Sequence, residues 1–182
     1  MKQSSIKRLF LSLLALIVLV SCDNKESLQM YFVNNQETPN FTTIDVPTDI
    51  VSFEDSDLSA EELEAYKSID KLNFLGYKID SNNLESYQVE MDKVKTILSD
   101  NKYTDLGEFN VQGSKMVVKY LGDDDTADEF IVFGNSRDVG FGVLRILGDD
   151  MSPAKLYKLT ETFNKGNIDQ AQLDNLTDFF KF

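Results

Sequence analysis

The stretch KMVVKYLGDDDTADEFIVFGNSRDVGFGVLRIL, residues 115–147, is typical of three β-strands joined by two short connections. The acidic connection after the first strand and the tight one after the second indicate an antiparallel meander. Gly140 and Gly142 leave one face of the third strand nearly bare, which predicts a closely crossing helix or a bulge. The strands are rich in Val, Ile, Phe and Tyr and are expected over Lys115–Leu121, Glu129–Asn135 and Val139–Leu147.

Further elements are expected before this meander. Alternating apolar residues predict strands at Leu28–Phe32, Thr42–Val46 and Leu75–Ile79. Ser59-Ala60-Glu61-Glu62 is a capping box that should open a helix running to about Asp70. The longest helix should follow a cap at Asn82 or Asn83, and its apolar seam faces either its own sheet, which a two-heptad stripe favours, or another chain. The seam consists of Leu84, Tyr87, Met91, Val94 and Leu98.

Two helices are expected after the meander. Ser152-Pro153 is a cap followed by proline at the first helical position, and Gly166 closes that helix. Asp169 with Gln172 should cap a final helix. The order of elements predicts an α+β fold whose antiparallel or mixed sheet includes the three-stranded C-terminal meander, with helices packed mainly on one face.

Most of residues 28–180 resembles the bacterial family called domain of unknown function 4252. The likeness is carried by hydrophobic pattern and a terminal Gly-Asp. The resemblance implies the fold and an exported compartment, because members typically carry a secretion or lipoprotein leader. It implies no activity and no catalytic residue. The matching segments are Lys71-Leu72 with the strand and helix after it, Glu129–Phe133, Phe141–Asp149 and Pro153–Leu156.

The first 21 residues have the form of a bacterial lipoprotein leader. Three basic residues precede an apolar run at 9–20, which is shorter than the roughly 20 residues needed to span a bilayer. Leu19-Val20-Ser21-Cys22 resembles a lipobox, so Cys22, the only cysteine, is the expected site of lipid attachment. Two or three acyl chains, such as palmitate, would hold the protein stably. The alternative is an ordinary signal peptide that ends near Cys22.

This leader sets the expected domain organisation and location. Residues 1–21 are the signal peptide, 22–27 a short polar tether, and 28–182 a single α+β domain. We expect the mature protein in the Gram-negative cell envelope, with the outer membrane as the expected anchor. Its domain would lie in the periplasm or at the cell surface.

Charge and composition narrow the function. The leader carries three of the 18 basic residues and none of the 31 acidic ones, which leaves 15 basic residues and a net charge of −16. Such a charge argues against nucleic acid as a partner. The chain has no histidine, the usual near-neutral acid–base group and commonest transition-metal ligand. We therefore expect no cofactor, and favour a non-enzymatic binding module with an envelope protein as partner. The alternative is an envelope hydrolase that uses two carboxylates.

Short motifs add few candidate residues. Asp123 to Asp125 with Asp128 and Glu129 could suggest calcium, but the spacing lacks an EF-hand framework and favours a solvated turn. The motif therefore predicts no metal ligand.

Two Ser-x-x-Lys matches occur, at Ser68/Lys71 and Ser152/Lys155. Both lack the companion segments of serine acyl-enzymes, so no catalytic residue is predicted. Asp125-Thr126-Ala127 resembles a bacterial O-glycosylation signal, which makes Thr126 a candidate for modification.

Overall fold

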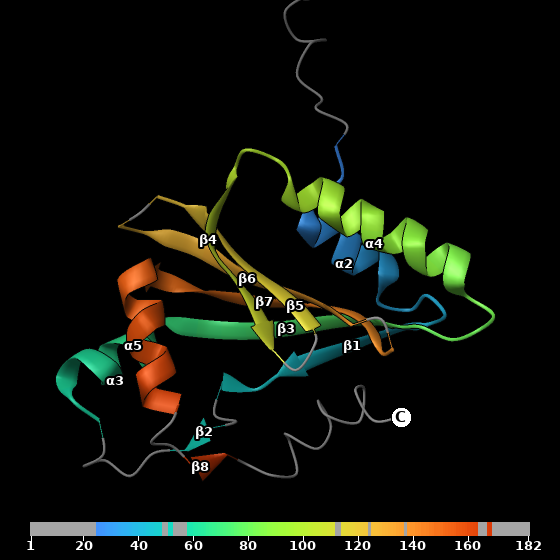
Figure 1. Ribbon diagram of the computed structural model, residues 1–182. Coiled ribbons are helices and arrows are strands. Elements are labelled where there is room, and N and C mark those ends of the chain that lie inside the picture. Colours follow the sequence, from blue (N-terminus) through green and yellow to red (C-terminus); the bar gives the residue numbers. More distant parts are fainter. Residues whose placement is uncertain are drawn as a thin grey trace, which may run out of the picture.

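The described part of the chain is an antiparallel sheet with helices against both of its faces (Figure 1). The computed structural model describes residues 25–48, 51–52, 58–111, 114–123, 125–136, 138–163 and 167–168. The helices are α2 (Leu28–Asn35), α3 (Ala60–Lys67), α4 (Leu84–Leu98) and α5 (Pro153–Phe163). The strands are β1 (Phe41–Val46), β2 (Val51–Ser52), β3 (Ile69–Lys78), β4 (Tyr103–Val111), β5 (Ser114–Gly122), β6 (Ala127–Ser136), β7 (Gly140–Met151) and β8 (Asn167–Ile168).

The main sheet has six strands in the order β1-β3-β7-β6-β5-β4, and every pairing is antiparallel. The predicted α+β fold, antiparallel sheet and meander β5–β6–β7 are confirmed. β4 extends this meander by an edge strand that the sequence did not reveal. Its residues are mostly exposed, so it lacks the apolar alternation of a half-buried strand.

The first predicted strand is instead the helix α2. Leu28, Tyr31 and Phe32 are its buried residues, which is the spacing of one helical face, whereas Met30 is 53% exposed. The Ser27 hydroxyl accepts a hydrogen bond from the Met30 amide at 3.1 Å and so caps the helix. The alternation of Leu28, Met30 and Phe32 was therefore misleading, because Tyr31 rather than Met30 faces the core.

Side chains on the two faces of the sheet form separate apolar clusters. One face, the α2/α4 face, packs beneath these two helices through residues such as Leu75, Ile131 and Val143. The opposite face, the α3/α5 face, contributes Phe130 and Ile146 to a second cluster with α3 and α5. Figure 1 shows α2 and α4 lying together over one side of the sheet, with α3 and α5 near one end of the other. The helices are thus divided between the faces, where the sequence placed them mainly on one.

The glycines of β7 are explained by neighbouring β3. A Cβ on Gly142 would lie 2.7 Å from the Phe74 ring, so an aromatic side chain covers the bare face, not a crossing helix. Gly140 has φ +129°, and a Cβ there would lie 1.9 Å from the Tyr77 carbonyl oxygen. Close approach of the β3 backbone therefore requires glycine at this position.

The predicted helix starts are confirmed in α3 and α5 and modified in α4. In α3 the Ser59 hydroxyl accepts from the Glu62 amide, and the Glu62 carboxylate accepts from the Ser59 amide, which forms the capping box. This helix ends at Lys67, earlier than expected. Asn83 holds the N-cap position of α4, but its side chain bonds to Asp80 and Lys78 in the preceding turn.

The start of α5 follows the predicted pattern. Ser152 accepts from the Lys155 amide at 3.3 Å in front of Pro153. The predicted leader and the final helix from Asp169 lie outside the described residues. Among the described helices, none combines the length and apolar character needed to cross a bilayer.

The α4 seam packs on the sheet, as the favoured interpretation predicted. Tyr87, Met91, Val94 and Leu98 are buried in the α2/α4 core, whereas Leu84 at the helix start is 58% exposed. We expect Met91→Asp to lower the free energy of unfolding by more than about 4 kcal/mol, because it buries an unpaired carboxylate. Chemical denaturation followed by circular dichroism measures this change.

Val89→Asp on the same helix is the matched control for Met91→Asp. Val89 is 50% exposed, so its substitution should change the free energy of unfolding by less than about 0.5 kcal/mol. Equal losses in the two variants would contradict the observed orientation of α4.

Candidate functional site

The two residues predicted to be modified differ in what the structure says of them. Cys22 lies outside the described residues, and Lys25 is the first residue described after it. Thr126 is exposed in the connection between β5 and β6. Its carbonyl oxygen accepts a hydrogen bond from the Asp123 amide at 2.9 Å, which closes the turn. The Thr126 side chain is thus accessible on a hairpin.

The acidic residues around this turn do not converge. Asp123, Asp125 and Asp128 are exposed, whereas Glu129 is buried under α2 and paired with Arg145. Within the described residues, no group of three or more carboxylates or other metal-ligating side chains could hold a metal ion. In the described part of the run, the carboxylates other than that of Glu129 are thus exposed to solvent.

The first Ser-x-x-Lys match has no catalytic geometry. The Ser68 hydroxyl is buried and donates to the Ala65 carbonyl oxygen at 2.7 Å, as expected for a serine at a helix end. Lys71 lies in β3 and its ammonium is 3.7 Å from the Asp45 carboxylate. The two side chains thus have separate structural contacts.

The second match is also structural. The Ser152 hydroxyl caps α5, and the Lys155 ammonium lies 2.6 Å from Asp150 and 2.9 Å from Glu64. Hydrogen bonds to Asp150 and then Glu64 raise the pKa of Lys155. A lysine held protonated cannot accept a proton from a serine, so this pair has no general base. Lys155 instead links α5 to α3.

A buried ion pair lies beneath α2, and it was not predicted from the sequence. Arg145 Nε is 2.5 Å from Glu129 Oε1, and Arg145 Nη2 is 3.1 Å from Glu129 Oε2. Both residues are less than 10% exposed, and the Phe32 ring of α2 lies 5.2 Å from the guanidinium carbon. This bidentate pair is covered by the helix that the sequence misassigned.

The sequence contained one signal for this pair. Glu129 lies on the same face of β6 as Ile131 and Phe133, and Arg145 lies on the same face of β7 as Val143, so each charge occupies a buried position on the α2/α4 face. Two opposite charges on inward positions of consecutive strands are expected to pair when those strands are neighbours.

Tyr103 connects this pair to the first residue of α2. Burial and the nearby Glu129 carboxylate raise the pKa of its phenol, and a hydrogen bond with the Leu28 backbone opposes that rise. Tyr103 is the first residue of β4 and is 6% exposed. The start of α2 is therefore hydrogen-bonded to the edge strand, in the electrostatic field of the buried charges.

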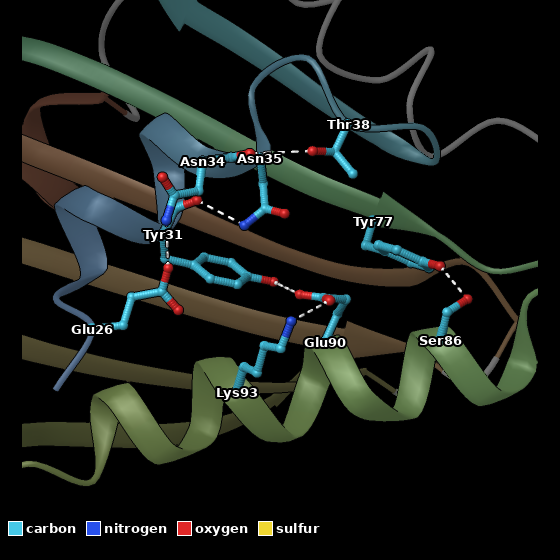
Figure 2. Close-up of polar contacts among 9 residues, drawn as sticks. All are labelled: Glu26, Tyr31, Asn34, Asn35, Thr38, Tyr77, Ser86, Glu90 and Lys93. Carbon is cyan, nitrogen blue, oxygen red and sulfur yellow. Dashed lines mark hydrogen bonds and ion pairs between the residues drawn. The ribbon is translucent and has the colours of Figure 1, made fainter. Parts of the chain in front are cut away.

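A second set of polar contacts joins α2 to α4 (Figure 2). The Tyr31 hydroxyl donates to Glu90 Oε2 at 2.9 Å, and Lys93 Nζ is 2.7 Å from Glu90 Oε1. Nearby, the Tyr77 and Ser86 hydroxyls are 2.8 Å apart and join β3 to α4. Burial first, and then the Glu90 carboxylate, raise the pKa of Tyr31. Its phenol is a hydrogen-bond donor that fixes α2, not an acid–base group near neutral pH.

The outward side of α2 carries two exposed apolar residues, and the helix itself contains no charged residue. Met30 and Val33 are 53% and 56% exposed and lie one turn apart. No Asp, Glu, Lys or Arg occurs between Glu26 and Glu37. We name this surface the α2 outer face; its exposed residues are Gln29, Met30, Val33, Asn34 and Gln36.

Comparison with known proteins identifies the family. The family model described as "Domain of unknown function (DUF4252)" matches residues 31–159, more than half of the 182 residues. The chain therefore belongs to this family, and the resemblance expected from its sequence is confirmed. No curated protein and no solved structure matches the chain.

The buried pair yields a direct stability prediction. Arg145→Met should lower the free energy of unfolding by about 3–5 kcal/mol, because Glu129 remains buried without its partner. Adding Glu129→Leu should recover most of this loss, since replacing both members of a buried pair by apolar groups is often neutral or stabilising. Denaturant unfolding of the single and double variants measures both effects.

Lys115→Met is the surface control for Arg145→Met. Lys115 pairs at 2.8 Å with Glu108, and the two side chains are 54% and 55% exposed. This loss should stay below about 1 kcal/mol. A double variant no more stable than Arg145→Met would contradict the proposed electrostatic origin.

The raised pKa of Tyr31 predicts a loss of stability at alkaline pH. The unfolded phenol ionises near pH 10, whereas the folded phenol stays protonated to higher pH. Stability from this group is therefore complete below about pH 10 and falls as the pH rises above it. Tyr31→Phe should make the melting temperature fall less steeply between about pH 10 and 12. Parallel curves for the two proteins would refute the assignment.

Proposed function

We propose that this member of the DUF4252 family is a lipoprotein of the Gram-negative cell envelope, anchored by acyl chains on Cys22. The observation that carries the proposal is the short distance between the lipobox and the folded domain. Only residues 23–27 separate Cys22 from Leu28, where α2 begins. Even fully extended, this tether holds the start of α2 within about 20 Å of Cys22. The domain would thus work at the membrane surface, with the outer membrane as the expected anchor.

The domain itself is proposed to bind another envelope component without catalysing a reaction. A carboxylate-dependent hydrolase would need two acids that converge in a cleft with pKa values pushed apart. The buried acids of the described residues are Glu62 and Glu129. Glu62 completes the α3 capping box, whereas Glu129 binds Arg145 on the other side of the sheet. These structural contacts favour the binding module over the hydrolase.

The proposed partners follow from charge and anchoring. The net charge of −16 after cleavage disfavours nucleic acid and favours solubility of a protein concentrated at a membrane. We propose the membrane as one partner, through the lipid, and an envelope protein as the other. The exposed hairpin position of Thr126 is compatible with O-glycosylation in the periplasm or at the cell surface.

Cys22→Ala tests the anchoring. The variant should lose all incorporation of a fatty-acid probe, because the acylated sulfur is gone, and should appear as uncleaved precursor or as soluble envelope protein. Gel fluorescence and membrane fractionation measure these outcomes. Thr126→Ala is the control and should keep full lipid incorporation. Probe incorporation that persists in Cys22→Ala would refute lipidation at this residue.

A further inference from the structure

The α2 outer face is unusual for so acidic a protein. Charged residues make up 27% of the chain, yet the ten residues from Ser27 to Gln36 contain none. Met30 and Val33 protrude from this segment one turn apart, with polar amides around them. The Glu26 carboxylate accepts a hydrogen bond from Asn34 Nδ2 at 2.8 Å, so the charge at this face comes from the residue before the helix cap. A lone exposed apolar residue is ordinary on a protein surface, but two on one turn of a helix can contact a bilayer interface.

The exposed apolar residue of the neighbouring helix α4 provides a contrast. Val89 is 50% exposed, but Glu85 and Asp92 lie four residues before and three residues after it on the same helix surface. Carboxylates at these positions are repelled by anionic lipids and strongly hydrated. On α2 the corresponding carboxylates lie at the two ends, with Glu26 four residues before Met30 and Glu37 four residues after Val33, and the helix itself contains none.

The position of α2 in the chain supplies the second argument. Its first residue lies within about 20 Å of Cys22, whichever path residues 23–27 follow. The helix is about 12 Å long, and it is held to the sheet through Phe32 and to α4 through Tyr31. An anchor at Cys22 therefore places this helix, more than any later element, next to the lipid.

We propose that the α2 outer face lies against the membrane that holds the lipidated Cys22, with Met30 and Val33 in contact with the headgroup region. The inference rests on the lipidation proposed above. It fixes the orientation of the domain: the exposed side of α2 faces the lipid, the exposed side of α4 around Val89 does not, and α3 and α5 lie on the opposite face of the sheet. The α3/α5 side would then be the one open to an envelope partner.

Fluorescence quenching tests this orientation in the full lipidated protein. Cys22 is the only cysteine and its sulfur would carry lipid, so Val33→Cys and Val89→Cys each provide a single free thiol for a fluorophore. The labelled proteins are reconstituted in vesicles of phosphatidylethanolamine and phosphatidylglycerol that contain headgroup-nitroxide lipids. The probe at 33 should lose most of its fluorescence, and the probe at 89 should keep most of it. Gln29→Cys, also exposed on α2, is a second reporter position.

A charge substitution completes the test. Met30→Glu should restore most of the fluorescence of the probe at 33, because it places a carboxylate on the contact surface. Val89→Glu, a matched charge on α4, should leave the quenching unchanged. Equal quenching at positions 33 and 89 would overturn the proposed orientation.

Detection of the acyl chains distinguishes a failure of the proposed orientation from a failure of the proposed lipidation at Cys22. Mass spectrometry of the same samples reports whether Cys22 is acylated. An unacylated protein would refute the proposed anchoring together with the orientation. An acylated protein whose α2 probes are not quenched would refute the orientation alone.

Discussion

The buried pair of Glu129 and Arg145 constrains how the whole sheet is assembled. Glu129 lies opposite Leu147, and Arg145 lies opposite Ile131, so the two charges are diagonal neighbours on the α2/α4 face. A one-residue slip of β7 against β6 would turn Arg145 to the other face and leave Glu129 buried without a partner. Because such a charge costs several kcal/mol, the pair penalises that register error strongly.

The same pair determines where α2 can lie. Phe32 covers the guanidinium, and Tyr103 joins the Glu129 surroundings to the start of the helix. Tyr31 then binds Glu90 and sets the distance between α2 and α4. Excluding water from the ion pair thus requires α2 in this position. A segment that directly follows the expected anchor is in this way built into the core.

This arrangement connects stability with the proposed function. A lipid anchor joined to a flexible arm would let the domain tumble freely above the membrane. Here the segment after the short tether is packed on the sheet, so the anchor can restrict how the domain is oriented. The buried charges support this packing, and in the proposed orientation the exposed residues Met30 and Val33 would meet the lipid surface.

Much of the fold could be predicted from local patterns, and the failures have physical reasons. The capping box at Ser59 and the apolar runs of β5 to β7 are signals contained within a few residues, and they were interpreted correctly. The strand prediction at Leu28 was wrong because so short a segment fits both the two-residue period of a strand and the 3.6-residue period of a helix. Only the packed core shows that Tyr31 is buried. Edge strand β4 has little apolar signal, because most of its residues are exposed.

The candidate sites also divide into those that the local sequence reveals and those that only the fold reveals. The proposals for Cys22 and Thr126 rest on short sequence motifs, so no structure was needed to make them. The Glu129–Arg145 pair and the α2 outer face depend on which residues the topology brings together. Sequence alone places Arg145 at an inward position but does not show that β6 is its neighbour and α2 its cover.

The central claim is that α2 is a fixed part of the core at the membrane end of the domain. Hydrogen exchange of the α2 backbone amides in the full lipidated protein tests it most directly. The account predicts that the amides of residues 31–35 exchange as slowly as those in the middle of α4, because both helices are held over the same buried face. Exchange at the rate of an unstructured peptide, while α4 stays protected, would show that α2 is not fixed and would contradict the account.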